Sequence, residues 1–391
     1  MSILLGILLT FLVFLVVVLI HELWHFTFAR LTGMKVLEFW FGIPPKVFRV
    51  FRDRKGTDYT MNLLPIGGFV RIKWEDPTSL ESLDPDSFSQ KKWWARSVVL
   101  IAGVTFNFIL AILIFTFSFF IGIAPIAPNF LTEKDYGSIL LPTPETALRD
   151  GYMSYSGIVL TPLSGSIAER SWILPGDILL MADTVAIQSP EQFMQMIGQK
   201  ESLSLLVQWT GSTRNITIKP QNKKVGMYIG YNELKINREY RLHYGLLASF
   251  SKSVVETYRL SYMTLAVLGD TFKNLLFPAT PEDRKIAEWM LAGPIGMWAG
   301  FVSLVDIGVT WKMIMMIIAI ISINLWVFNL LPFPALDGGR LVSTTFRALF
   351  ANTTLDRHRF SQIENTIHAW WMVLLLGLSL LVAYFDISKF F

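Results

Sequence analysis

The motif HELWH at residues 21–25 places two histidines at a spacing that suits a metal ion. In a helix, residues four apart lie on one face, so the imidazoles of His21 and His25 can reach the same Zn²⁺. Glu22 lies beside them as a candidate general base. The uncharged apolar run that precedes the motif, residues 3–20, is long enough to enter a membrane. The pattern predicts a zinc hydrolase centre at the edge of a bilayer.

A third protein ligand is needed, because catalytic zinc usually takes three and leaves a fourth position for water. The sequence contains no cysteine, so the ligand must be His, Asp or Glu. Asp337 ends a charge-free apolar segment, in NLLPFPALDGGR (329–340), where a carboxylate needs a cation or another partner. Pro332 and Pro334 must break that helix, and the glycines after Asp337 allow close chain approach. We expect Asp337 to complete the site.

The chemistry of such a site is peptide hydrolysis. Bound zinc lowers the pKa of its water toward about 7, and Glu22 would accept the proton and later deliver it to the leaving amine. The competing interpretation is a chance HExxH match or an interfacial pair of histidines. We favour the metal site, because chance would have to supply the motif, its position at a membrane and a depth-matched aspartate together.

The composition indicates a polytopic membrane protein, since 52% of the 391 residues are hydrophobic and only 16% are charged. The net charge of +4 would also suit nucleic acid, but the basic residues cluster in loops beside apolar segments, as membrane orientation requires. We therefore predict a lipid bilayer and no nucleic acid as partner. We interpret the first apolar run as a retained helix, not a signal peptide. Four segments can span a membrane: residues 3–24, 97–124, 313–336 and 366–385.

Charge predicts the orientation of these spans. Lysine and arginine are dense between the first two spans and recur after the third, at Arg340 and Arg347, which places both regions in the cytoplasm. Both termini and residues 125–312 should then be extracytoplasmic. The C-terminal ends of spans one and three reach the same cytoplasmic-side depth, so residues there can share a metal.

The regions between the predicted spans differ in amino-acid composition. Residues 56–75 have β-type composition interrupted by Pro65, and they suit either a soluble hairpin or a loop that folds back into the membrane region. Residues 151–220 fit a short β-rich domain, and residues 241–290 suit an amphipathic interfacial helix. We divide the chain into four regions. Residues 1–124 hold the first two spans and the hairpin, and residues 125–235 form an extracytoplasmic domain. Residues 236–312 form interfacial helices, and residues 313–391 hold the last two spans.

These motifs resemble those of the bacterial site-2 proteases of the regulator-of-sigma-E (RseP) type, which are intramembrane zinc metalloproteases of the M50 type. HELWH, PIGGFVRIKWE, AGVTFN at 102–107, GPIG at 293–296 and NLLPFPALDGG occur in the family's order. The resemblance implies a polytopic α-helical membrane protein of four transmembrane helices. It also implies a membrane re-entrant β loop and a small α/β PDZ-like domain on the extracytoplasmic side.

The resemblance implies roles for individual residues. Zinc would be bound by His21, His25 and Asp337, with Glu22 as the catalytic acid and base. The loop of Gly67 and Gly68 would offer a β edge to an unwound transmembrane helix, because strand addition replaces the hydrogen bonds that the opened helix loses. We assign to substrate binding Asn329, Gly67, Gly68, Phe69, Pro332 and Pro334.

One segment of the extracytoplasmic domain matches the bacterial PDZ sequence pattern except at a few positions. Residues 165–179, GSIAERSWILPGDIL, are similar to the bacterial PDZ pattern, but Ser171-Trp172 replaces the usual Ala-Gly. Ala182-Asp183 likewise replaces an Asn-Gly turn. Many proteins of this type carry two such modules, whereas the available length here suits one.

We therefore expect an intramembrane zinc endopeptidase of the bacterial inner membrane, with its active site near the cytoplasmic side. Its substrates would be single-pass membrane proteins already trimmed outside by a site-1 protease, such as anti-sigma factors or remnant signal peptides. One alternative is a catalytically inactive, membrane-anchored PDZ scaffold that binds protein tails. Another is a zinc transporter or metal sensor, which would have no need of Glu22.

Overall fold

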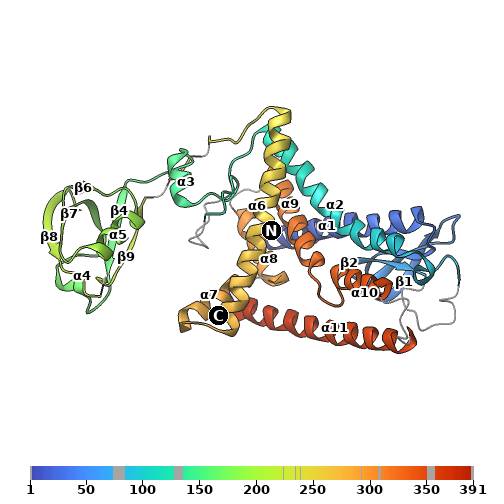
Figure 1. The fold of residues 1–391 in the computed structure, drawn as a ribbon. Coiled ribbons are helices and arrows are strands. Elements are labelled where there is room, and N and C mark those ends of the chain that lie inside the picture. Colours follow the sequence, from blue (N-terminus) through green and yellow to red (C-terminus); the bar gives the residue numbers. More distant parts are fainter. Residues whose placement is uncertain are drawn as a thin grey trace. The chain divides into compact units, whose positions relative to one another are not determined.

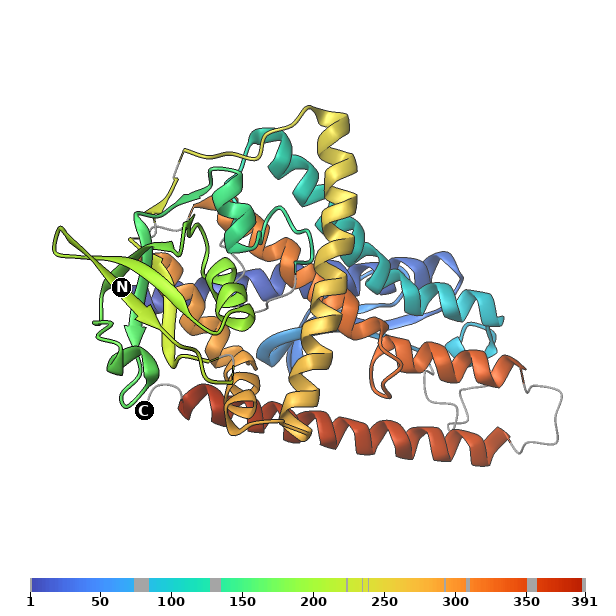
Figure 2. The ribbon, with the colours of Figure 1, turned by 60° about the vertical axis from the view of Figure 1, so that its left-hand side comes forward.

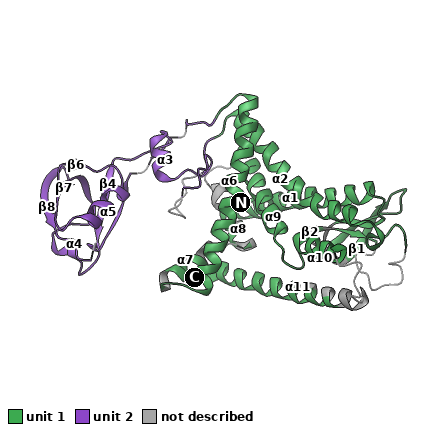
Figure 3. Ribbon diagram, in the orientation of Figure 1, with its two compact units in different colours: residues 1–123, 243–391 green, residues 124–242 purple. Residues whose placement is uncertain are grey.

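The computed structural model separates the chain into two compact units (Figures 1 and 3). The first comprises Met1–Ile123 and His243–Phe391, and the second is Ala124–Leu242. The last residues of the segment 56–75 fall outside the described part of the chain. The structure describes residues 2–73, 84–126, 135–222, 224–233, 235–237, 239–291, 293–306, 310–349 and 357–388.

Four helices of the described residues are long and apolar enough to cross a membrane, as the sequence predicted. The third predicted span, 313–336, was too long at its C-terminal end. The helix stops at Leu330, because a helix cannot continue through Pro332 and Pro334. The four helices are α1 (Ser2–Leu31), α2 (Trp93–Ile121), α9 (Trp311–Leu330) and α11 (Arg357–Ser388).

Helix α2 is the centre of the first unit, and it packs beside α1 and α9 (Figure 2). Its other neighbours are α6 (Leu246–Leu276) and α10 (Asp337–Leu349). Small hydroxyl side chains let α6 approach closely, and Thr116 of α2 shares a 2.7 Å hydrogen bond with Ser253 of α6. A polar contact of this kind is a common way to join helices in lipid.

Two shorter helices, α7 (Pro281–Met290) and α8 (Pro294–Asp306), precede α9. Helix α8 packs on α1, where the glycine at position 6 leaves room for Val302. The start of α8 is tied to the last span, because the buried carboxylate of Asp386 accepts hydrogen bonds from the backbone N–H groups of Gly293 and Gly296, at 2.9 and 2.8 Å. The GPIG segment is therefore an anchor for α11.

Strands β1 (Val36–Arg52) and β2 (Asp58–Ile72) form a sheet that lies against α1. The register places residues 38–41 opposite 58–61 and also opposite 68–71, while residues 46–52 lie opposite 58–62. The two long strands are therefore folded over into four sheet segments. Residues 68–72 pair on one side only within the described chain, so they form an edge.

The second unit holds a six-stranded antiparallel sheet in the order β8-β7-β5-β4-β9, with β6 paired to β5. Its core is a continuous apolar cluster that includes Leu160, Leu179, Phe193 and Leu205, all at most 2% exposed. The elements of this unit are α3 (Pro144–Arg149), β3 (Met153–Ser154), β4 (Gly157–Pro162), α4 (Ile167–Arg170), β5 (Asp177–Ala182), β6 (Val185–Ala186), α5 (Pro190–Gln199), β7 (Leu203–Trp209), β8 (Ser212–Ile218), β9 (Met227–Asn232) and β10 (Lys235–Ile236).

Several residues of this unit have left-handed backbone, among them Trp172 at φ 66° and Asp183 at φ 55°. The Asp183 carboxylate accepts a hydrogen bond from Lys200 at 2.5 Å, which holds the pKa of that carboxyl below its usual range. An aspartate tolerates this backbone better than most residues, whereas a tryptophan does not.

Candidate metal centre

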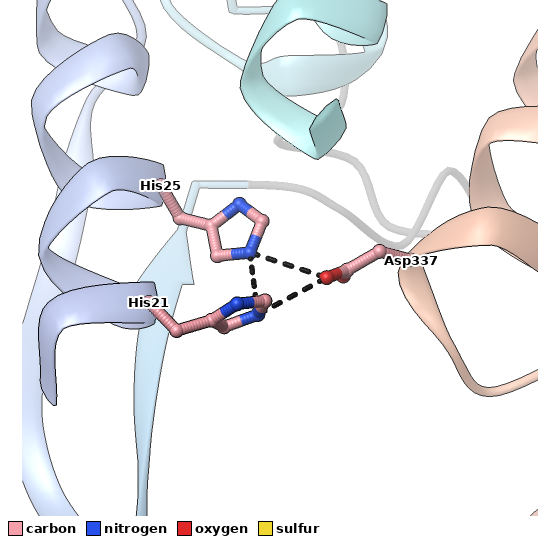
Figure 4. A group of neighbouring side chains, drawn as sticks. All are labelled: His21, His25 and Asp337. Carbon is pink, nitrogen blue, oxygen red and sulfur yellow. Dashed lines mark hydrogen bonds and ion pairs between the residues drawn. The ribbon is translucent and has the colours of Figure 1, made fainter. Parts of the chain in front are cut away.

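Three side chains from distant parts of the chain meet at one point (Figure 4). The Nε2 atoms of His21 and His25 are 3.0 Å apart, and the Oδ2 atom of Asp337 lies 3.1 Å from the first and 3.3 Å from the second. Donor atoms bound tetrahedrally to one Zn²⁺ lie roughly 3.3 Å apart, given bond lengths near 2.0–2.1 Å. The three separations therefore fit one ion.

Helix geometry places the two histidines on one face of α1. His21 and His25 lie on the same face of α1, and both are at most 8% exposed. Their spacing is the one that the sequence predicted for a shared ligand face. Nothing about the local backbone of α1 has to be unusual for this pair to form.

Asp337 is positioned by a break between α9 and α10. After Leu330 the chain turns, Ala335 takes a left-handed φ of 76°, and α10 begins at Asp337 itself. The two residues after Asp337 must be glycines, because the backbone of the break lies too close for a side chain. A Cβ at Gly338 would lie 2.3 Å from the carbonyl oxygen of Leu331. A Cβ at the next position, Gly339, would lie 2.1 Å from the Phe333 oxygen. The predicted role of the two glycines is thus seen directly.

The three donor atoms suit a cation. Oδ2 of Asp337 is buried and accepts no hydrogen bond of good geometry from the described residues. It faces two imidazole nitrogens that also carry lone pairs when they are deprotonated. A buried carboxylate with such neighbours is stabilised by a metal ion. The residues present therefore fit zinc.

Helix α2 supplies contacts that the sequence analysis did not assign. The Nδ1 atom of His25 lies 2.8 Å from the carbonyl oxygen of Val99, and Nδ1 of His21 lies 3.1 Å from the amide of Asn107. Between them, a Cβ at Gly103 would lie 2.3 Å from His25 Nε2. The available signal was a glycine and an asparagine four residues apart in an apolar span, within AGVTFN.

The other predicted site residues are dispersed around this centre. Glu22 is half-buried on α1, and a Cβ at Gly68 of β2 would lie 3.0 Å from its Cγ, so the sheet edge reaches the candidate base. Asn329 is half-buried in the last turn of α9. Pro332 and Pro334 lie in the break that leads to Asp337.

Gly67 and Phe69 are the two remaining residues that the sequence assigned to substrate binding. Gly67 lies within β2, and Phe69 lies in the same strand opposite Trp40. The surroundings of the Phe69 side chain fall outside what is described. Their assignment to substrate binding stays a prediction.

Comparison with known proteins extends over nearly the whole chain. Residues 9–377 match the model of peptidase family M50. A Fusobacterium nucleatum protein whose name assigns it to the zinc metalloproteases is 27% identical over 384 residues, which cover 96% of each chain. The regulator of sigma E protease of Haemophilus influenzae is 25% identical over 446 residues, again covering 96% of each. The cofactor is accordingly Zn²⁺, and the chain belongs to peptidase family M50.

Proposed function

We propose that the protein is an intramembrane zinc metalloendopeptidase that hydrolyses peptide bonds within the transmembrane segments of single-pass membrane proteins. The observation that carries this proposal is the convergence of His21, His25 and Asp337, in which both histidines and Glu22 belong to a helix apolar enough to span a bilayer. A water-filled site at that depth would meet few substrates other than membrane segments. Ionisable groups are costly within a membrane, so their presence there points to a functional site.

The residues of the site divide the chemistry between them. His21, His25 and Asp337 would hold the ion, which supplies Lewis acidity and a bound water of lowered pKa. Glu22, adjacent to the first ligand, would accept the proton of that water as the peptide carbonyl is attacked. It would then donate the proton to the leaving amine. Asn329, at the end of α9, is proposed to donate a hydrogen bond to the substrate backbone.

Substrate presentation is proposed to use the edge of the sheet. A helical substrate hides its amides in intrahelical hydrogen bonds, so it must unwind before cleavage. Residues 68–72 pair on one side only within the described chain, and Gly68 lies against Glu22. A substrate strand added at this edge, next to Gly67 and Phe69, would regain its hydrogen bonds beside the proposed general base. The sheet would then act as the re-entrant loop of the membrane region.

The second unit is proposed to be a single PDZ-like domain. Trp172 and Asp183 stand where the bacterial pattern has glycine, and both have the left-handed backbone that glycine favours. We propose that the domain restricts access by bulky ectodomains.

We further propose that the chain is a multi-pass protein of the bacterial inner membrane, with both termini and the PDZ-like domain outside. The active site would lie near the cytoplasmic side, as the basic loops indicate. Substrates would be anti-sigma factors or remnant signal peptides after site-1 trimming. Two relatives from Haemophilus and Salmonella are named as proteases that regulate sigma E, which supports the first class.

The test is cleavage of a single-pass reporter in membranes that contain the full chain. We expect Glu22→Gln to lower cleavage about 10²- to 10⁴-fold, the usual contribution of a general base, while zinc stays bound. Glu201→Gln, at an exposed carboxylate, is the matched control and should cleave normally. Normal cleavage by the Glu22 variant would contradict the mechanism, and an uncleaved reporter with the wild type would favour an inactive scaffold.

A further inference from the structure

We infer that Asn107 is a positioning residue, which holds His21 in the tautomer that binds zinc by accepting a hydrogen bond from its Nδ1–H group. The inference rests on the proposed zinc site and adds a residue to it. Asn107 is fully buried in α2, 86 residues away from His21 in sequence, and its amide lies 3.1 Å from His21 Nδ1.

The first step of the argument is the face of α2 that meets the histidines. Val99, Gly103 and Asn107 are each four residues apart, so they follow one another along one side of the helix. Val99 contacts His25 through its carbonyl oxygen, and Asn107 contacts His21 through its side chain. Gly103, between them, leaves the space in which the two rings lie. One helix face therefore supports both ligands.

The second step is the proton on each imidazole. Both Nε2 atoms are turned toward Asp337, so each must carry a free lone pair to bind a metal. The proton of each neutral ring then resides on Nδ1. For His25 that N–H donates to the carbonyl of Val99 at 2.8 Å. For His21 the neighbouring groups are the backbone of Gly103 and the Asn107 amide, and the amide can present its oxygen as an acceptor.

The third step concerns the amide itself. The nitrogen Nδ2 of Asn107 faces His21 Nδ1, while the oxygen Oδ1 is buried without a hydrogen-bond partner among the described residues. Two donors facing each other would be unfavourable, and a half turn of the amide exchanges its oxygen and nitrogen without other movement. That turn gives His21 an acceptor and satisfies the buried oxygen. The same orientation of the amide thus suits both the zinc-binding tautomer of His21 and the buried Asn107 oxygen.

The consequence is measurable as metal affinity. Partners of this kind orient a ligating histidine and raise its basicity, and their loss typically weakens metal binding by about 10–100-fold. Water cannot replace the amide readily, since the site of Asn107 is closed to solvent. Asn107 should therefore set how tightly zinc is held.

The experiment measures zinc affinity of the full-length protein in detergent by competition with a chelator. We expect Asn107→Leu, which keeps the volume but removes the acceptor, to bind zinc about 10–100-fold more weakly. Asn107→Asp retains an acceptor and should bind zinc as the wild type does. Leu113→Ala, at an exposed position of α2, is the control and should change nothing. Thermal unfolding of the metal-free variants checks the fold, and Asn107→Ala replaces the leucine variant if that one unfolds.

The outcomes separate this inference from the proposed site. If Asn107→Leu binds zinc normally while His21→Ala does not, the positioning role is overturned and the site stands. If His21→Ala also retains zinc, the proposed ligands themselves are wrong. If Asn107→Asp loses zinc as severely as the leucine variant, an acceptor is not what His21 requires, and the inference fails.

Discussion

The two halves of the proposed metal centre are built in contrasting ways. His21 and His25 project from the uninterrupted helix α1, whereas Asp337 projects from the start of α10, after a break in the chain. The helix needs only the right spacing, because its backbone positions residues four apart on one face. The break needs a left-handed residue, Ala335, and very close backbone contacts. A regular element thus supplies the pair, and an irregular one supplies the ligand that closes the site.

This difference determines where each half is vulnerable. The histidine side depends on the neighbouring helix leaving space, since α2 contacts both rings. The aspartate side depends on its own backbone. Adding a methyl group at Gly103 should therefore disturb the histidines by filling their space, whereas adding one at Gly339 should disturb Asp337 by distorting its backbone.

The largest effect is expected at Gly103. Gly103→Ala would place its Cβ 2.3 Å from His25 Nε2 and 2.9 Å from His21 Cε1, in the space of the ligands themselves. We expect zinc binding and reporter cleavage to be lost together. Gly377→Ala is the matched control in another span, where a Cβ meets nothing within 4 Å. Retained zinc in the Gly103 variant would show that the histidines are not held by α2.

A smaller effect is expected at Gly339. Gly339→Ala would bring its Cβ within 2.1 Å of the Phe333 oxygen, so the break must distort and carry Asp337 with it. We expect a stability loss of about 1–3 kcal/mol, as for other overpacked positions, together with weaker zinc binding. Thermal unfolding with and without zinc measures both. An unchanged unfolding temperature would mean that the break is more adaptable than its contacts indicate.

The smallest effect is expected at Ala335, whose φ of 76° suits glycine. Ala335→Gly relieves backbone strain but also gains freedom in the unfolded chain, so the two effects should nearly cancel, within about 1 kcal/mol. Ala335→Val should instead destabilise, because a β-branched side chain is poorly tolerated there. Equal unfolding temperatures for the two variants would show that the left-handed backbone at Ala335 does not limit which side chain is tolerated there.

The sequence indicated which three candidate ligands come together better than it indicated the residues that pack around them. HELWH specifies a ligand pair by local spacing, and Asp337 was found because a charge ends an apolar span at the matching depth. For Gly103 and Asn107 the sequence offered only their spacing within AGVTFN, which does not say what they contact. Their role depends on which face of α2 meets α1, and this is decided by packing between segments far apart in the sequence.

The sheet between the first two spans was also predicted only in part from the sequence. Its β-type composition was recognisable in residues 56–75, but the register that folds β1 and β2 into four segments was not. Register depends on turns and on which face packs against α1, where Phe39 and Tyr59 contact Phe26. The position of Gly68 beside Glu22 follows from that register.

The most direct test of the central claim is the zinc content of the purified full-length protein and its variants. The account predicts one Zn²⁺ per chain in the wild type and in Glu22→Gln, and little zinc in His21→Ala, His25→Ala or Asp337→Ala. Undiminished zinc in the three ligand variants would contradict the account, because the ion would then be held elsewhere.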